Sequence, residues 1–137
     1  MRAPVRRAEI IAVGTELLGS TRIDSNSLFL SGRLGALGIE LGAKSVVGDD
    51  RAALGALVRQ ALERADLLIV TGGLGPTDDD VTRDAVADAL GLPLDEDPAI
   101  VERIAGRFAR RGLRMPDVNR KQALVPRGAT VLDNPNG

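Results

Sequence analysis

The chain has 137 residues, a hydrophobic content of 44% and a formal net charge of −1, and it contains neither histidine nor cysteine. These absences exclude Ser-His-Asp and Cys-His nucleophilic machinery, disulfides and ordinary zinc sites, so any metal would be a hard ion held by oxygen ligands. The only two aromatic residues are Phe29 and Phe108, so the aromatic platforms that stack single-stranded nucleic acid are missing.

The length fits one domain, and no apolar run approaches the roughly 20 residues that a membrane span needs. The basic start, residues 1–7, lacks the apolar core of a signal peptide. The absence of cysteine suits a cytoplasmic protein. We therefore expect a single cytoplasmic domain with neither a membrane nor a nucleic-acid partner.

The first half of the chain predicts alternating strands and helices. Residues 8–13 predict a buried strand that ends at Gly14, and residues 39–47 predict a second strand before a polar turn at 48–50. Between them lies a helix with Asp24 or Ser25 as its cap and Gly38 as its stop. Its inward positions are expected to be Leu30, Leu34 and Leu37. A second helix starts from Asp50, and its apolar stripe comprises Leu54, Leu57, Val58, Ala61, Leu62 and Ala65.

The second half continues with a continuously apolar strand at 66–71, typical of a central parallel strand. A helix follows the glycine-rich turn and runs to about Leu90, and another begins at Asp97-Pro98 and ends near Gly112. Its inward residues are expected to be Val101, Ile104 and Phe108. Short strands are predicted at 122–126 and 130–132. The order β-α-β-α-β-α-α-β implies a layered α/β domain with a mainly parallel sheet.

The run from Val70 to Thr82, VTGGLGPTDDDVT, is the most informative stretch of the chain. A strand that passes through a glycine-rich turn into a helix start can aim backbone N–H groups at a phosphate. The simpler interpretation is that the glycines only permit a tight turn. Three glycines in four positions, followed by Pro76 and Thr77, favour the ligand loop, although neither the P-loop nor the dinucleotide fingerprint is present.

The three aspartates at 78–80 have two interpretations. They are placed where a divalent metal on the phosphate would want oxygen ligands. They would also suit the positive end of a helix dipole, with Asp79 paired to Arg83 four residues on. Adjacent residues on a helix point about 100° apart. For that reason we expect only one or two of the three to be functional.

Polar residues follow the ends of three predicted strands, at 14–16, 48–50 and 72–80. In parallel sheets the ligand crevice lies outside these carboxyl ends, so the three segments are expected to converge. Asp50 is the better helix cap, which leaves Asp49 as the freer carboxylate. Glu16 is either a ligand to backbone N–H groups or a site residue. The segment at 24–26 is expected to be a capping cluster first.

Two basic segments lie further on. The arginines at 107, 110, 111 and 114 surround a helix end, where cations suit the dipole, and they are interpreted as a solvated face without a role. Residues 119–122, Asn-Arg-Lys-Gln, are short and polar and enter a strand. They could reach an anionic ligand or a partner subunit.

Taken together, VGTELL (13–18), DSN (24–26), the run 72–82, NRKQ (119–122) and NPNG (134–137) resemble the amino-terminal domain of the competence-damage-inducible CinA family. The resemblance implies a three-layer α/β/α sandwich of the MoaB/MogA-like molybdopterin-binding type. It also implies a nucleotide-like or pterin-like anionic ligand over the glycine-rich loop. Since the family pattern continues past the last motif, it further implies a domain at 1–137 that is incomplete at its C-terminal end and has no amidase domain.

The resemblance also assigns site residues. Gly72, Gly73, Gly75, Pro76 and Thr77 correspond to the phosphate loop. Asp80 and Asp49 correspond to aspartates shared with the pterin-binding relatives, and Asp79 belongs to the acidic pair of the CinA branch. Leu74, where the pterin enzymes more often have threonine, favours that branch.

The expected function is therefore metal-dependent hydrolysis of a nucleotide pyrophosphate such as ADP-ribose. Asp79 and Asp80 are the expected metal ligands, with Asp80 central to catalysis and Asp49 or Glu16 as general base. The expected cofactor is Mg²⁺ or a similar divalent ion, with K⁺ as a further candidate, and the expected assembly is a homodimer. The alternatives are a pterin-binding or adenylyl-transferring module of molybdenum-cofactor assembly, and a non-catalytic oligomerisation domain.

Overall fold

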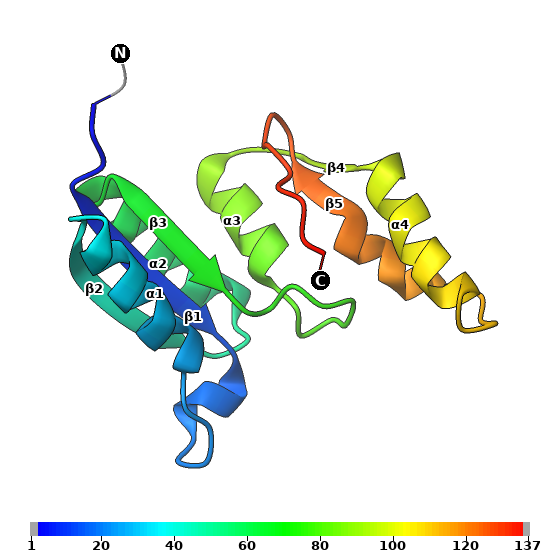
Figure 1. Ribbon diagram of the computed structural model, residues 1–137, viewed down its shortest axis with the longest axis horizontal. Helices are drawn as coiled ribbons and strands as arrows, with labels where there is room; N and C mark the ends of the chain where they lie inside the picture. The colour runs from blue at the N-terminus through cyan, green and yellow to red at the C-terminus, as the bar shows by residue number, and fades with distance from the viewer. Residues whose placement is uncertain (1–2, 136–137) are drawn as a thin grey trace.

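Three parallel strands form the centre of the computed structural model, which describes residues 3–135 (Figure 1). They are β1 (Arg7–Val13), β2 (Glu40–Val47) and β3 (Leu67–Thr71), in the spatial order β2-β1-β3. Both pairings are parallel, and β1 is the central strand. The chain therefore crosses over twice through helices, as parallel pairing requires.

Helices cover both faces of this sheet, which confirms the three-layer prediction (Figure 1). Ala8 and Ile10 of β1 pack with Leu34 of α1 (Ser25–Ala36) on one face. Ile11 and Val13 face the other way. There they pack with the buried residues of α2 (Arg51–Arg64) and α3 (Thr82–Leu90), which are Leu54, Val58, Ala61 and Ala85. The period-two alternation of the strand thus builds two separate cores.

Helix starts agree with the predicted caps. The carboxylates of Asp24, Asp50 and Asp97 each accept a hydrogen bond from a backbone N–H in the first turn of the helix that follows. Gly38 lies just past the end of α1 with a φ of +73°, a conformation that suits glycine. Ordinary capping chemistry therefore explains these three aspartates.

A smaller unit follows α3 and packs beside the sheet domain (Figure 1). It consists of β4 (Leu94–Glu96), α4 (Pro98–Ala109), the 3₁₀ helix η2 (Asp117–Ala123) and β5 (Leu124–Pro126). β4 and β5 form an antiparallel pair. Two ion pairs, Arg127 with Asp95 and Arg120 with Glu96, join its segments.

Several predictions for this part of the chain were wrong. No strand forms at 130–132; these residues are exposed, and within residues 3–135 no strand pairs with them. The strand predicted at 122–126 begins only at Leu124, because the preceding residues form η2. β4 and the 3₁₀ helix η1 (Thr15–Leu18) were not predicted, since three or four residues carry little periodicity. The final two residues of the 134–137 motif lie outside the described residues.

Some residues predicted to face inward do not. Leu37 is 74% exposed at the end of α1, and Leu62 of α2 is 45% exposed. In α4 none of the residues is fully buried; Val101, Ile104 and Phe108 are half-buried. None of the helices among residues 3–135 has the length and apolar character needed to cross a membrane.

One charged group lies inside the sheet domain. The carboxylate of Glu9, in the central strand, has a side-chain exposure of 3%. Arg64 in the last turn of α2 binds both carboxylate oxygens, with distances of 2.6 Å from Nε to Oε1 and 3.1 Å from Nη2 to Oε2. The hydrogen bond to Glu9 raises the pKa of Arg64. This pair ties the end of α2 to the middle strand.

Removal of Arg64 should therefore destabilise the fold, because it leaves the buried carboxylate of Glu9 without its partner. We expect Arg64→Met to lower the melting temperature by roughly 5 °C. The double variant Glu9→Leu/Arg64→Met should recover most of this loss, because it leaves no unpaired buried charge. Thermal denaturation of the three proteins measures both effects. Equal stability of Arg64→Met and the wild type would contradict the role of the pair.

Candidate functional site

The ends of the three parallel strands meet, as the sequence predicts. The N–H of Gly14, after β1, donates to the carbonyl of Val47 at the end of β2, at 2.9 Å. Thr15 and Asp49 then bind each other: the Asp49 N–H donates to Thr15 Oγ1 at 3.0 Å, and the Thr15 N–H donates to Asp49 Oδ2 at 3.3 Å. The carboxylate of Asp49 is thereby fixed at the edge of the sheet where a ligand crevice is expected.

The glycine-rich loop leaves β3 pressed against the end of β1. Gly72 has a φ of +82°, and a Cβ atom there would collide with the carbonyl oxygen of Val13. The Gly72 carbonyl accepts a hydrogen bond of 2.8 Å from the hydroxyl of Thr82, the first residue of α3. The glycine is therefore required by close backbone approach, and the loop is fixed at both ends.

Asp80 closes the loop. Its Oδ2 atom accepts hydrogen bonds from the Thr77 N–H at 2.9 Å and from Thr77 Oγ1 at 2.7 Å. A Cβ atom on Gly75 would lie 2.5 Å from the same oxygen, so a larger residue at 75 would displace the carboxylate. Because this side chain folds back on the loop, α3 begins only at Thr82. Of the two interpretations of residues 78–80, the one that placed them in the first helical turn was wrong.

Opposing effects act on the ionisation of Asp80. Partial burial favours the protonated form, but hydrogen bonds from the Thr77 hydroxyl and the Thr77 and Gly75 backbone amides favour the carboxylate, as does the charge of Lys121. The net result is a pKa of Asp80 below its ordinary value. The loop is thus closed by an ionised group at neutral pH.

Basic residues from other elements hold the loop from outside. Arg83 does not pair with Asp79 as predicted; it donates to the Leu74 carbonyl at 2.7 Å and to the Gln122 carbonyl at 3.5 Å. Burial lowers the pKa of Arg83. The Lys121 ammonium donates to the Thr77 carbonyl at 2.7 Å. From the sequence, the segment 119–122 was expected to reach an anionic ligand or a partner subunit. In the structure it supports the loop.

The loop has unused hydrogen-bond donors. Its bonds within residues 3–135 involve neither the N–H of Gly73 nor that of Leu74. Pro76, half-buried, has no N–H and stiffens the turn, while Thr77 is exposed beside Asp80. Backbone N–H groups at the mouth of a strand-to-helix loop are the donors that suit a phosphate oxygen.

The acidic residues do not make a metal site from protein atoms alone. Across the described residues, no three acidic side chains gather closely enough to hold a metal ion. Asp79 is exposed, and Asp80 already has Oδ2 engaged by Thr77. Mg²⁺ in proteins is often held by one or two carboxylates together with substrate phosphates and water. The donor set fits Mg²⁺ in that shared form.

Glu16 lies on η1 next to the crevice. Its side chain is exposed, and its carboxylate oxygens lie over Gly14, 2.7 Å from where a Cβ atom at position 14 would be. Unlike Asp49, it makes no hydrogen bond or ion pair within the described part of the chain. Of the two candidate bases, the geometry fixes Asp49 and leaves Glu16 unconstrained.

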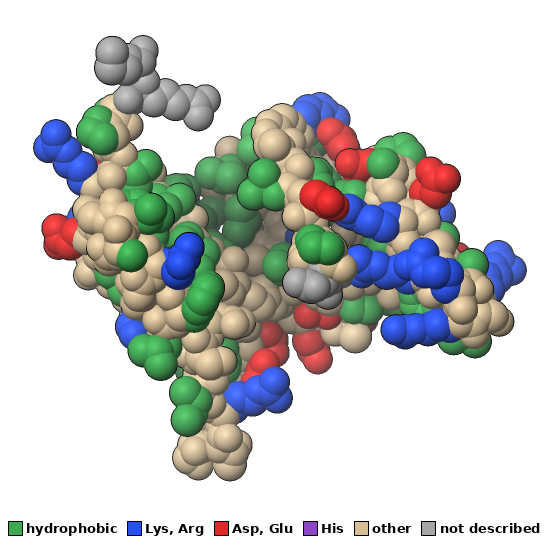
Figure 2. All heavy atoms as spheres, viewed as in Figure 1, with side chains coloured by type: hydrophobic (Ala, Val, Ile, Leu, Met, Phe, Trp, Pro, Cys, Tyr) green, Lys and Arg blue, Asp and Glu red, His purple; other side chains and the backbone are tan. Residues whose placement is uncertain are grey.

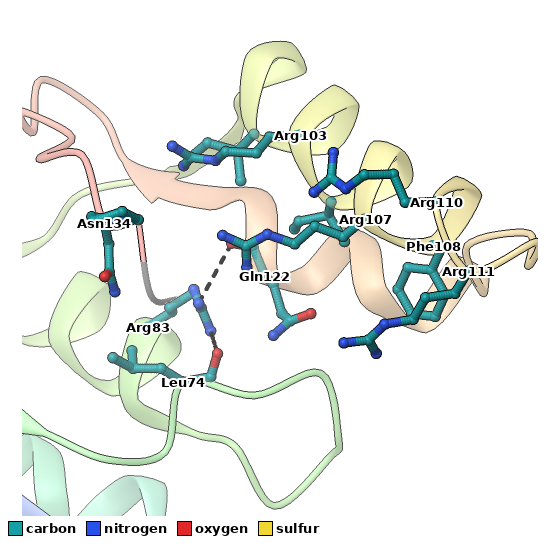
Figure 3. A pocket seen from close by; sticks show the side chains of 12 residues that line it. Leu74, Arg83, Arg103, Arg107, Phe108, Arg110, Arg111, Gln122 and Asn134 are labelled. Atoms are coloured by element: carbon teal, nitrogen blue, oxygen red, sulfur yellow. Dashed lines mark hydrogen bonds between the residues drawn. The ribbon is translucent and has the colours of Figure 1, made fainter.

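A groove adjoins the loop and was missed from the sequence (Figure 3). Its volume is about 780 Å³, and its walls come from Leu74 of the loop, α3, α4, η2 and Asn134. Five arginines line it: Arg83, Arg103, Arg107, Arg110 and Arg111. The sequence signal was the cluster of arginines at 107, 110, 111 and 114 around a helix end. That cluster was interpreted as a solvated face, because the position of the loop opposite could not be known.

Comparison with known proteins gives a consistent picture. A family model described as "Probable molybdopterin binding domain" matches residues 9–134. A CinA-like protein of Koribacter versatilis is 50% identical over 130 residues, which cover 95% of this chain and 31% of the relative. The chain thus spans about a third of the length of the curated relatives it matches.

Two solved structures are similar. The crystal structure of CinA from Thermoplasma acidophilum, a protein described as of unknown function, matches with a TM-score of 0.88 and 31% identity, covering 96% of this chain and 77% of that one. The molybdopterin biosynthesis enzyme MoaB from Thermus thermophilus matches with a TM-score of 0.58 and 24% identity, covering 87% and 72%. The second likeness shows a shared fold.

The closure by Asp80 predicts a pH dependence. Because the folded pKa of Asp80 is lowered, its stabilising contribution is present above the unfolded pKa of about 3.9 and is lost as the pH falls through the folded value. We expect Asp80→Asn to lower the unfolding free energy by about 1 kcal/mol at pH 7, because it removes the charge from two hydrogen bonds that water partly screens. The difference from the wild type should shrink below about pH 4.

Urea denaturation between pH 2.5 and 7 measures this difference. The matched control is Asp79→Asn, since Asp79 is exposed and makes no hydrogen bond within the described residues. It should change stability little at pH 7. A difference between Asp80→Asn and wild type that stays constant down to pH 2.5 would contradict closure by an ionised Asp80.

Proposed function

Since the chain belongs to the CinA family and consists of a probable molybdopterin binding domain, we propose that it binds a small phosphate-bearing nucleotide and hydrolyses its pyrophosphate bond. The proposed substrate class is that of ADP-ribose. One observation carries the proposal: a rigid glycine-rich loop, closed by Asp80, lies at the strand edge where Asp49 is also fixed.

Phosphate binding is assigned to the loop 72–77. The N–H groups of Gly73 and Leu74, which have no hydrogen-bond partner within residues 3–135, are donors for phosphate oxygens, and the hydroxyl and backbone of Thr77 are held in place by Asp80 and Lys121. The hydrogen bonds of Thr77 with Asp80 and Lys121 hold the loop in one conformation, and such order lowers the conformational entropy that binding costs. Such pre-organised donors act most strongly on charge that develops during the reaction.

The reaction adds water across the pyrophosphate bond. The oxygen of water attacks one phosphorus, the bond from that phosphorus to the bridging oxygen breaks, and ADP-ribose yields AMP and ribose 5-phosphate. Asp49, fixed by Thr15, is the proposed acceptor of the proton from water, with Glu16 as the alternative base. Mg²⁺, held by Asp79 and Asp80 with the ligand phosphates, would supply charge neutralisation at the reacting phosphates. K⁺ is a further candidate cation.

A second candidate function is supported by the family description, which names molybdopterin. The same loop would then hold the phosphate of a pterin, and the chain would bind that ligand or transfer an adenylyl group to it. The two candidates share the loop and differ in the ligand. Adenylyl transfer that requires both molybdopterin and ATP would favour the second.

The test is AMP formation from ADP-ribose, followed by chromatography, with Mg²⁺ and after its removal by EDTA. We expect turnover that stops on metal removal and returns when Mg²⁺ is added. Asp80→Ala should lose at least about 100-fold in kcat, as should Asp49→Asn, because each removes a group proposed to act on the transition state. A control is Glu63→Ala, an exposed carboxylate on α2 remote from the loop.

Three outcomes separate the candidates. Metal-dependent turnover that Asp80→Ala abolishes and Glu63→Ala preserves would support hydrolysis. Ligand-induced thermal stabilisation without turnover would contradict hydrolysis and support a binding module. With neither turnover nor stabilisation, the non-catalytic oligomerisation domain, with a homodimer as its expected form, would replace both.

A further inference from the structure

The groove beside the loop has an unusual charge pattern for a chain with a net charge of −1. Its lining holds five arginines and, among the described residues, neither aspartate nor glutamate. Figure 2 shows the basic side chains gathered over α4, and Figure 3 shows them directed toward the hollow. A concave, single-sign surface concentrates anions and strengthens their binding.

Most of these arginines form no ion pair within the described part of the chain. Arg103 is paired with Asp133 at 3.0 Å, and Arg83 binds backbone carbonyls. Arg107, Arg110 and Arg111 have no ion pair anywhere in residues 3–135. An arginine that forms no ion pair with a carboxylate can use the N–H donors of its planar guanidinium group to bind a phosphate.

Their spacing also points to a ligand. Arg103 and Arg107 lie four residues apart on one face of α4, and Arg110 and Arg111 follow directly after the helix. Like charges at this helical spacing repel one another and destabilise a helix. The helix dipole favours cations near a C-terminus, but it does not require that they line a groove. An anion in the groove would relieve the repulsion.

The groove has an apolar side as well as a basic one. Ile100, Ile104 and Phe108 of α4 contribute to its lining, and Phe108 is half-buried. An aromatic ring beside guanidinium groups suits a nucleobase or sugar flanked by phosphate. The volume of about 780 Å³ is within the range of small-molecule sites.

The groove and the phosphate loop are joined. Leu74 belongs to both: its side chain lines the groove while its carbonyl is bound by Arg83. Gln122 lines the groove and follows Lys121, which holds the loop at Thr77. A ligand whose pyrophosphate lies on the loop would therefore have the groove next to it.

We propose that the arginines at the C-terminal end of α4 bind a second phosphate group, so that the preferred ligand is a nucleotide with a pyrophosphate and, on its nucleoside ribose, an additional phosphate monoester. The proposal rests on the proposed function for the pyrophosphate part of the ligand. It adds a terminal anion site to which Arg107, Arg110 and Arg111 contribute. ADP-ribose 2′-phosphate is the probe of this class, and ADP-ribose is its match without the extra phosphate.

The experiment is isothermal titration of the two nucleotides into the full chain at 50 mM salt, with EDTA present so that neither nucleotide is hydrolysed during the titration. We expect ADP-ribose 2′-phosphate to bind the wild type about 10-fold more tightly than ADP-ribose does, because it gains one charge-assisted contact that is partly exposed to water. A groove variant, Arg107→Gln/Arg110→Gln/Arg111→Gln, should reduce the ratio of affinities to near one while changing ADP-ribose binding less than about 3-fold.

The control variant removes three positive charges elsewhere, Arg22→Gln/Arg33→Gln/Arg59→Gln, all exposed positions. This control should keep the 10-fold ratio of affinities for the two nucleotides. If the ratio fell equally in the groove variant and in the control, the preference would be a general effect of net charge, and the proposal would be overturned. The single variant Arg111→Gln, at an exposed site, should lower the ratio by about 2–3-fold without a folding defect.

The remaining outcomes are also decisive. Binding of both nucleotides to the wild type with equal affinity would overturn the second phosphate site alone. Binding of neither would overturn the proposed function together with this inference. Titration with inorganic phosphate alone distinguishes a site for free phosphate from a site for the phosphate monoester of a nucleotide. If inorganic phosphate binds the groove while the two nucleotides bind with nearly equal affinity, the groove is a site for free phosphate and the proposal is overturned.

Discussion

The hydrogen bonds from Thr77 to the Asp80 carboxylate are the interaction on which the site depends. They close the glycine-rich loop before α3 begins and require a glycine at position 75. Lys121 and Arg83 then fasten the closed loop to the smaller unit through backbone carbonyls. Asp80 thus closes the loop, while Lys121 and Arg83 connect the closed loop to η2. The environment of Asp80 stabilises the charged form, so the closure is intact at neutral pH.

Much of this architecture could be predicted because local chemistry and fold agree. The apolar runs of β1 and β3 and the capping aspartates 24, 50 and 97 each encode their element within a few residues. Convergence of the strand ends followed from parallel pairing, since it is a property of topology. The β4–β5 pair was missed because its strands have three residues each and depend on contacts between distant segments.

The acidic run illustrates the limit for the site. From the sequence, Asp78 to Asp80 suit a helix start, and Asp79 and Arg83 have helical pairing distance. In the structure Asp80 folds back on Thr77 instead, and Arg83 is drawn to the Leu74 and Gln122 carbonyls. The arginines at 107, 110, 111 and 114 were likewise assigned to solvent. Only the tertiary arrangement, in which α4 packs on η2 and faces Leu74 of the loop across a groove, makes three of them part of the groove wall, and no local pattern encodes that arrangement.

Binding of nucleotide phosphates by the closed loop can be tested by an NMR titration of the backbone amides with ADP-ribose. We expect the largest shifts at Gly73 and Leu74, whose N–H groups have no partner within the described residues. Adenosine, which lacks phosphates, should leave these two amides unchanged. Shifts confined to other elements, or equal shifts with adenosine, would contradict phosphate binding by the loop.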